Sequence, residues 1–278
     1  MTKRIPGLGK AVVVLSILTA MGGCKIQISM PQGIPGWVAA QSASTWCLRL
    51  DDGSLDEDSV CEADVVDTTF DETFIAVPAG GYVFSGWKKD HRHLCGGSRK
   101  PCSLSTAGFA GNDALMAFLR DDDEVFFLEP VFTPGEVALA GDYEGAWTNV
   151  TFETSGAISL AIVDNADDTF DITIDLDGNV LGQGDPGPVT IVAEVLPSGL
   201  IRAFGELDIA GVAAPYRLEI DTEAAVTVVT FDIPELPIVG FRSLEVFGII
   251  NGGTGYLEYK LTLAGTDEAV GTIAIYKP

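Results

Sequence analysis

Basic residues and histidine are scarce in this 278-residue sequence. It has 16 Lys and Arg against 40 Asp and Glu, a formal net charge of −24, and two histidines. Because binding to phosphates needs a basic face, this balance excludes nucleic acid as an expected partner and disfavours adsorption to anionic membrane surfaces. The 47% of hydrophobic residues is typical of a folded globular protein.

The sequence also lacks the motifs of the common enzyme classes. It contains no G-x-S-x-G, no H-E-x-x-H, no phosphate-binding loop and no dinucleotide fingerprint. Ser85 and Lys88 spell S-x-x-K, but S-D-N and K-T-G do not follow. With forty acidic residues, the sequence does not exclude an enzyme that uses only a pair of carboxylates. We therefore predict a protein that is not an enzyme.

The apolar run near the N-terminus is too short for a transmembrane helix. Residues 11–20 are apolar apart from two hydroxyl residues and follow three basic residues, whereas a spanning helix needs about 20 apolar residues. This pattern is typical of a secretory signal peptide. We expect residues 1–23 to be that signal.

Small residues lead from this run to Cys24, in the segment Met21-Gly22-Gly23-Cys24. The segment resembles the lipobox of bacterial lipoproteins. The resemblance implies that Cys24 becomes the N-terminus and carries a diacylglyceryl group. Because Lys25 follows in place of Asp, it also implies anchoring in the outer membrane, facing the periplasm or the cell surface. The alternative is an ordinary secreted protein with an incidental Cys24.

Cysteine is absent from the second half of the chain. The four cysteines that remain besides Cys24 are Cys47, Cys61, Cys95 and Cys102. An even number in an exported protein favours two disulfides. Three pairings are open, and the local one joins Cys47 to Cys61 and Cys95 to Cys102.

A zinc site is the alternative use of two of these cysteines. His91, His93, Cys95 and Cys102 lie within twelve residues. Their spacing differs from the usual zinc motifs, and disulfides form first in an oxidising compartment. We therefore predict no metal at this position.

A β-rich first domain is predicted for residues 46–133, after a lipid anchor and tether over residues 24–45. Residues 69–77, 82–87 and 123–132 read as strands, and residues 112–120 as a short helix with Asn112 as its N-cap. The motif G-Y-x-F-x-G-W consists of Gly81, Tyr82, Phe84, Gly86 and Trp87. We expect Trp87 to pack in the core, under the loop between Cys95 and Cys102.

This motif, together with the four cysteines, resembles the cysteine-containing bacterial repeat related to the internalin-type B repeat. The resemblance covers about residues 46–132. It implies a small disulfide-stapled β-grasp-like domain that acts as a spacer or adhesive unit and has no catalytic residues.

Residues 134–278 are predicted to form an antiparallel β-barrel or β-sandwich. Turn signals separate short alternating runs with no convincing helix. The candidate strands are residues 143–150, 157–163, 169–176, 180–182, 188–196, 200–207, 216–220, 225–231, 243–249, 255–263 and 270–276. Gly145 and Trp147 are similar to the G-x-W start of lipocalin-like barrels, which implies that they plug the barrel floor.

Acidic turns are the remaining candidate ligands. Residues 51–58, 121–124 and 164–168 are rich in carboxylates, which calcium prefers. Solvated turns that keep the protein soluble are the simpler explanation. We predict no cofactor, with calcium as the alternative.

The sequence thus predicts a mainly β, non-enzymatic lipoprotein of the outer membrane that serves as a surface or envelope binding or structural module. Its expected partners are the membrane, through the lipid, and an unknown protein, glycan or small apolar ligand. One alternative is a lipocalin-like carrier of a small hydrophobic ligand. Another is carbohydrate binding through a solvent-facing row of Trp37, Tyr143, Tyr256 or Tyr259.

Overall fold

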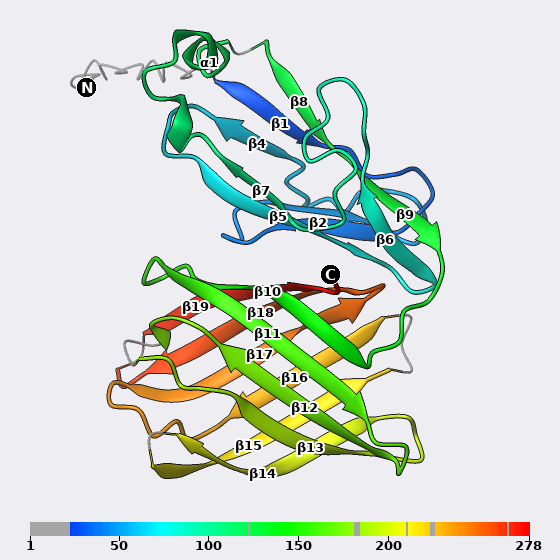
Figure 1. Cartoon of the computed structure of the whole chain (residues 1–278), viewed down its shortest axis with the longest axis vertical. Helices are drawn as coiled ribbons and strands as arrows, with labels where there is room; N and C mark the ends of the chain where they lie inside the picture. The colour runs from blue at the N-terminus through cyan, green and yellow to red at the C-terminus, as the bar shows by residue number, and fades with distance from the viewer. Residues whose placement is uncertain (1–22, 122, 181–183, 210, 223–225, 266) are drawn as a thin grey trace, which may run out of the picture.

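The computed structural model describes residues 23–121, 123–180, 184–209, 211–222, 226–265 and 267–278. In this part of the chain, small β-sheets with two disulfides precede a closed ten-stranded antiparallel β-barrel (Figure 1). The predicted mainly β fold class is confirmed, and the second part is a barrel rather than a sandwich.

The first domain is built from short strands and little helix. In chain order its elements are β1 (Cys24–Ile28), β2 (Gly36–Ala40), β3 (Trp46–Arg49), β4 (Glu62–Val65), β5 (Asp71–Pro78), β6 (Tyr82–Trp87), β7 (Cys102–Ser105), the 3₁₀ turn η1 (Ala107–Phe109), α1 (Asp113–Phe118), β8 (Val125–Leu128) and β9 (Pro130–Pro134). They form three sheets, in the orders β4-β1-β8, β3-β2-β5-β7 and β6-β9. The side chain of Asn112 caps α1 by accepting hydrogen bonds from the next turn, which confirms the predicted N-cap.

The expected tether over residues 24–45 is wrong, because these residues belong to the folded domain. Strand β1 is the centre of its sheet, antiparallel to β4 and parallel to β8. Cys24, Ile26 and Ile28 alternate toward the core, and every residue of Gly36–Ala40 is buried. The alternation is short, and only partners that come later in the chain complete the two sheets.

The barrel begins a few residues after β9. Its strands are β10 (Gly141–Asn149), β11 (Thr154–Asp164), β12 (Thr169–Leu176), β13 (Val189–Val195), β14 (Ile201–Ile209), β15 (Val212–Asp221), β16 (Thr227–Ile233), β17 (Phe241–Asn251), β18 (Thr254–Leu263) and β19 (Glu268–Tyr276). Each strand pairs with the next, and β10 pairs with β19 to close the ring. The short strand expected over residues 180–182 falls mostly outside the described residues.

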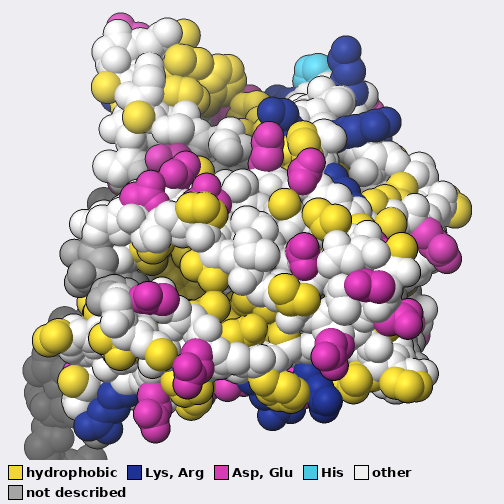
Figure 2. Space-filling view, turned by 60° about the horizontal axis from the view of Figure 1, so that its bottom comes forward, with side chains coloured by type: hydrophobic (Ala, Val, Ile, Leu, Met, Phe, Trp, Pro, Cys, Tyr) yellow, Lys and Arg dark blue, Asp and Glu magenta, His cyan; other side chains and the backbone are white. Residues whose placement is uncertain are grey.

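The barrel wall is weakest between β13 and β14. Only two residue pairs join these strands, Glu194 with Arg202 and Val195 with Ile201, whereas the neighbouring ladder from β14 to β15 joins nine. Beyond the hairpin the two strands diverge (Figure 1). Figure 2 views this side of the barrel, where a hollow lined by hydrophobic side chains opens among scattered acidic side chains. The ring is therefore closed on this side by a short ladder.

The barrel interior is apolar and mostly filled. Inward side chains such as Ile162, Ile191 and Leu261 are 3%, 1% and 0% exposed. A cavity of about 80 Å³ lies among Trp147, Tyr259 and other interior residues. Ligand pockets are typically about 300–1,000 Å³, so this cavity does not favour the carrier alternative.

One wall of the barrel packs against the first domain. The shared apolar cluster contains Trp37, Ala39, Ile75, Val77, Tyr256 and Ala274. At its edge Thr254 Oγ1 donates a hydrogen bond to the carbonyl of Ala76 at 2.9 Å. Asn251 Nδ2 donates to the carbonyl of Pro78 at 2.8 Å. The contact involves β2 and β5 on one side and β17 to β19 on the other, which joins the two domains end to end (Figure 1).

Reduction of the disulfides should loosen the first domain and leave the barrel folded. Both disulfides, Cys47–Cys61 and Cys95–Cys102, lie in the first domain, and loss of a disulfide typically costs about 2–4 kcal/mol. Circular dichroism during heating, with and without dithiothreitol, tests this: the near-ultraviolet signal of the first-domain tryptophans should be lost at a lower temperature than the far-ultraviolet β signal. Simultaneous loss of both signals would contradict it.

Candidate functional site

Cys24 is buried at the start of β1. Its side chain is 6% exposed, and its Sγ atom lies 3.8 Å from the carbonyl oxygen of Val65. Burial raises the pKa of this thiol, and the charge of Glu124 adds to the effect. Because the thiolate is the reactive form of cysteine, burial disfavours reaction at Cys24 in the folded protein.

The cavity beside Cys24 is almost entirely apolar. It has a volume of about 330 Å³ and is lined by residues of β1, β4, β7, β8, η1 and α1. Ser105 and Thr106 are its polar lining residues, and Thr106 Oγ1 already donates a hydrogen bond to the carbonyl of Asp67 at 2.8 Å. This cavity is within the size range of ligand pockets, and nothing in the sequence indicated it, because its walls come from distant segments.

The disulfides rule out the zinc alternative. Cys95 and Cys102 are bonded to each other, so their thiols cannot ligate a metal. His93 instead lies with its Nε2 atom 3.2 Å from Oε2 of Glu129, which Lys88 also contacts at 2.9 Å. Lys88, His93 and Glu129 therefore form one polar group, without the side chain of His91.

Trp87 lies under the loop that the second disulfide closes. Its side chain is 2% exposed, and its Nε1 atom donates to the carbonyl of Lys100 at 3.0 Å. Gly86 has a φ of 126°, and a Cβ there would lie 2.8 Å from the carbonyl oxygen of Ser98. Glycine therefore lets the loop approach the strand. Of the other motif residues, Phe84 is buried against Trp87, Tyr82 is partly buried, and Gly81 has a φ of 78° in the preceding turn.

The G-x-W motif of Gly145 and Trp147 lies on β10, and the side chain of Trp147 points into the barrel. Trp147 is 4% exposed, and its Nε1 atom donates to the carbonyl of Asp177 at 3.0 Å. Its ring covers Gly156, where a Cβ would come within 2.6 Å of Nε1. Gly145 lies on the same strand, opposite Ile158 and Ile275. The tryptophan fills the interior next to the small cavity described above.

The solvent-facing aromatic row that the carbohydrate-binding alternative requires is not formed by its four named residues. Trp37, Tyr143, Tyr256 and Tyr259 are 6%, 2%, 4% and 9% exposed. Trp37 and Tyr256 pack between the two domains, whereas Tyr143 and Tyr259 point into the barrel. Burial raises the pKa of Tyr259 to about 12. These four side chains therefore cannot bind a carbohydrate at the surface of the folded protein.

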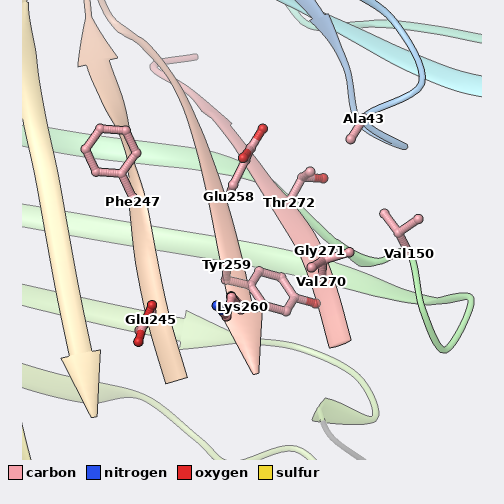
Figure 3. A pocket seen from close by; sticks show the side chains of 10 residues that line it. All are labelled: Ala43, Val150, Glu245, Phe247, Glu258, Tyr259, Lys260, Val270, Gly271 and Thr272. Carbon is pink, nitrogen blue, oxygen red and sulfur yellow. The ribbon is translucent and has the colours of Figure 1, made fainter. Parts of the chain in front are cut away.

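A groove on the outer wall of the barrel has two carboxylates among its lining residues, Glu245 and Glu258. Figure 3 shows this groove of about 370 Å³, which β17, β18 and β19 line together with Ala43 of the first domain. Glu245 and Glu258 lie diagonally across two strands, and Lys260, opposite Glu245, is bound to Glu268 at 2.8 Å. Both groove acids are exposed, whereas a catalytic carboxylic acid that works near neutral pH is normally desolvated. The groove does not support glycosidase chemistry.

The acidic turns use their carboxylates to form local hydrogen bonds. Asp52 accepts hydrogen bonds from the backbone and side chain of Ser54, and these bonds lower its pKa. Asp121 and Asp164 each accept from a backbone N–H two residues later. Across the described part of the chain, no group of three or more His, Cys, Asp or Glu side chains is placed to hold a metal ion. The turns are explained by their own geometry.

No helix among the described residues is long and apolar enough to cross a membrane. The predicted signal peptide lies almost wholly outside these residues. Comparisons of the chain with protein families, curated proteins and solved structures found no match.

Proposed function

We propose that the protein is a non-enzymatic outer-membrane lipoprotein, anchored through Cys24, that holds its barrel away from the bilayer as a binding or structural module. The position of Cys24 is the observation that supports this most. Strand β1 begins at Cys24 next to α1, at the end of the first domain that is far from the barrel (Figure 1). A lipid there would place the first domain at the membrane and the barrel outside it.

The anchor requires two covalent changes at Cys24. The Sγ–H bond is replaced by an Sγ–C bond to the diacylglyceryl group of a phospholipid, whose phosphorylated headgroup leaves with the thiol proton. The peptide bond before Cys24 is then hydrolysed. Because the folded strand buries the thiol, this transfer precedes folding of the first domain. More than one acyl chain is needed for stable membrane attachment.

The intact mass of the protein purified from its native membrane tests this proposal. We expect the mass of residues 24–278 plus acyl chains, with a gain of four hydrogens when the two disulfides are reduced. Lipidated protein should fractionate with the outer membrane, and the Cys24→Ala variant should appear in the soluble fraction. An unmodified Cys24 in protein purified from the membrane would contradict the proposal.

A further inference from the structure

The cavity beside Cys24 has the lining chemistry of a site for a hydrocarbon chain. Eleven of its thirteen lining residues are apolar or cysteine. Four of them, Phe70, Phe109, Phe118 and Phe126, are phenylalanines that come from separate parts of the first domain. No charged side chain lines the cavity, so it suits an uncharged chain and disfavours an ionic ligand.

The thiol of Cys24 belongs to the wall of this cavity. Hydrogen bonds to β4 and β8 fix the strand on both sides, with Cys24 opposite Val65 and Lys25 opposite Val125. The side chain cannot turn to solvent unless the start of β1 separates from these neighbours. A group bonded to Sγ must therefore begin inside the cavity.

The outer wall of the cavity is helical and loosely packed. Helix α1 is six residues long and has no fully buried residue. Leu115 on this helix is half-buried, and Phe118 is 40% exposed although it lines the cavity. This wall can adjust to a chain beneath it at a low cost in packing.

We propose that one acyl chain of the lipid on Cys24 lies in this cavity, beneath α1. The inference rests on the proposed lipidation of Cys24 and adds to it where the lipid goes. The covalent bond makes the cavity the nearest apolar surroundings for the chain, so no separate binding step is needed. The other chains remain free to enter the bilayer, and α1 is held at the membrane surface.

Photo-cross-linking in native membranes tests the location of the chain. A fatty acid with a diazirine group is incorporated by the bacterial host, the membranes are irradiated, and peptides of the purified lipoprotein are analysed by mass spectrometry. We expect cross-links from the lipid of the Cys24 peptide to the segments that contain Leu104, Leu115 and Phe126 of the same molecule.

Two variants of α1 provide a matched comparison. Leu115→Trp adds volume at a residue that lines the cavity, whereas Met116→Trp adds it at a neighbouring half-buried residue that does not. Overpacking typically costs about 1–3 kcal/mol, so we expect the internal cross-link in Leu115→Trp to fall at least about fivefold. We expect Met116→Trp to retain it. Leu104→Phe, a smaller addition, replaces Leu115→Trp if that variant does not fold.

The outcomes separate this inference from the proposed function. Lipidated protein whose chains cross-link only to membrane lipids would overturn the inference and leave the anchor in place. An equal loss of the internal cross-link in Leu115→Trp and Met116→Trp would also count against it. An unmodified Cys24 would overturn both proposals together.

Discussion

Trp87→Ala should lower the free energy of unfolding of the first domain by about 3–5 kcal/mol. The side chain is 2% exposed, and its ring meets Phe84 edge-on with the ring centroids 5.3 Å apart. The backbone of the same residue bonds the disulfide loop twice, through Ser98 and Gly97. Removal of the indole leaves a cavity between the strand and that loop, together with an unpaired carbonyl at Lys100.

Chemical denaturation followed by circular dichroism measures this loss, and amide hydrogen exchange locates it. Exchange should become faster in residues 24–134 and stay nearly unchanged in residues 141–276. The control is Val60→Ala, at a side chain that is 50% exposed, which should change the stability by less than about 0.5 kcal/mol. A loss below about 1 kcal/mol for Trp87→Ala would show that the motif does not organise this core.

Trp147→Ala should destabilise the barrel by a similar amount, about 3–5 kcal/mol. The indole fills the interior beside the cavity of about 80 Å³ and covers Gly156. Truncation would join the space of the side chain to that cavity, and the carbonyl of Asp177 would lose its donor. The residue thus combines a packing role with a hydrogen bond.

Trp147→Phe separates these two contributions, because it keeps most of the volume and removes the N–H. We expect Trp147→Phe to lower the free energy of unfolding by only about 0.5–1.5 kcal/mol, the usual contribution of one hydrogen bond. Val163→Ala on the same sheet is the control, since Val163 is 52% exposed on the outer face. If Trp147→Ala matched Val163→Ala in unfolding experiments, the interior role assigned to Trp147 would be wrong.

Much of the barrel could be predicted from the sequence because each of its hairpins is local. Turn residues such as Gly199 and Gly252, both with positive φ, separate alternating runs that bury one face. The choice between barrel and sandwich could not be made, since it depends on the pairing of β10 with β19, more than a hundred residues apart. The local disulfide pairing was one of three open alternatives.

The errors lie where distant segments meet. Residues 24–45 looked like a tether because two short strands carry little signal without their partners. A solvent-facing position for Trp37 and Tyr256 stayed open as part of the carbohydrate-binding alternative, because their burial depends on contact between the two domains. The cavity beside Cys24 depends on six elements and has no signature in any single segment.

The short ladder between β13 and β14 lies opposite the wall that the first domain covers. In the ring of ten strands, β13 and β14 are across from β18 and β19. If the two residue pairs between β13 and β14 separate, the ring becomes a curved sheet with β10 and β19 near its middle and both free edges on the far side. The first domain would then contact the middle strands of that sheet. The backbone ladder with the fewest residue pairs therefore lies on the side of the ring farthest from the first domain.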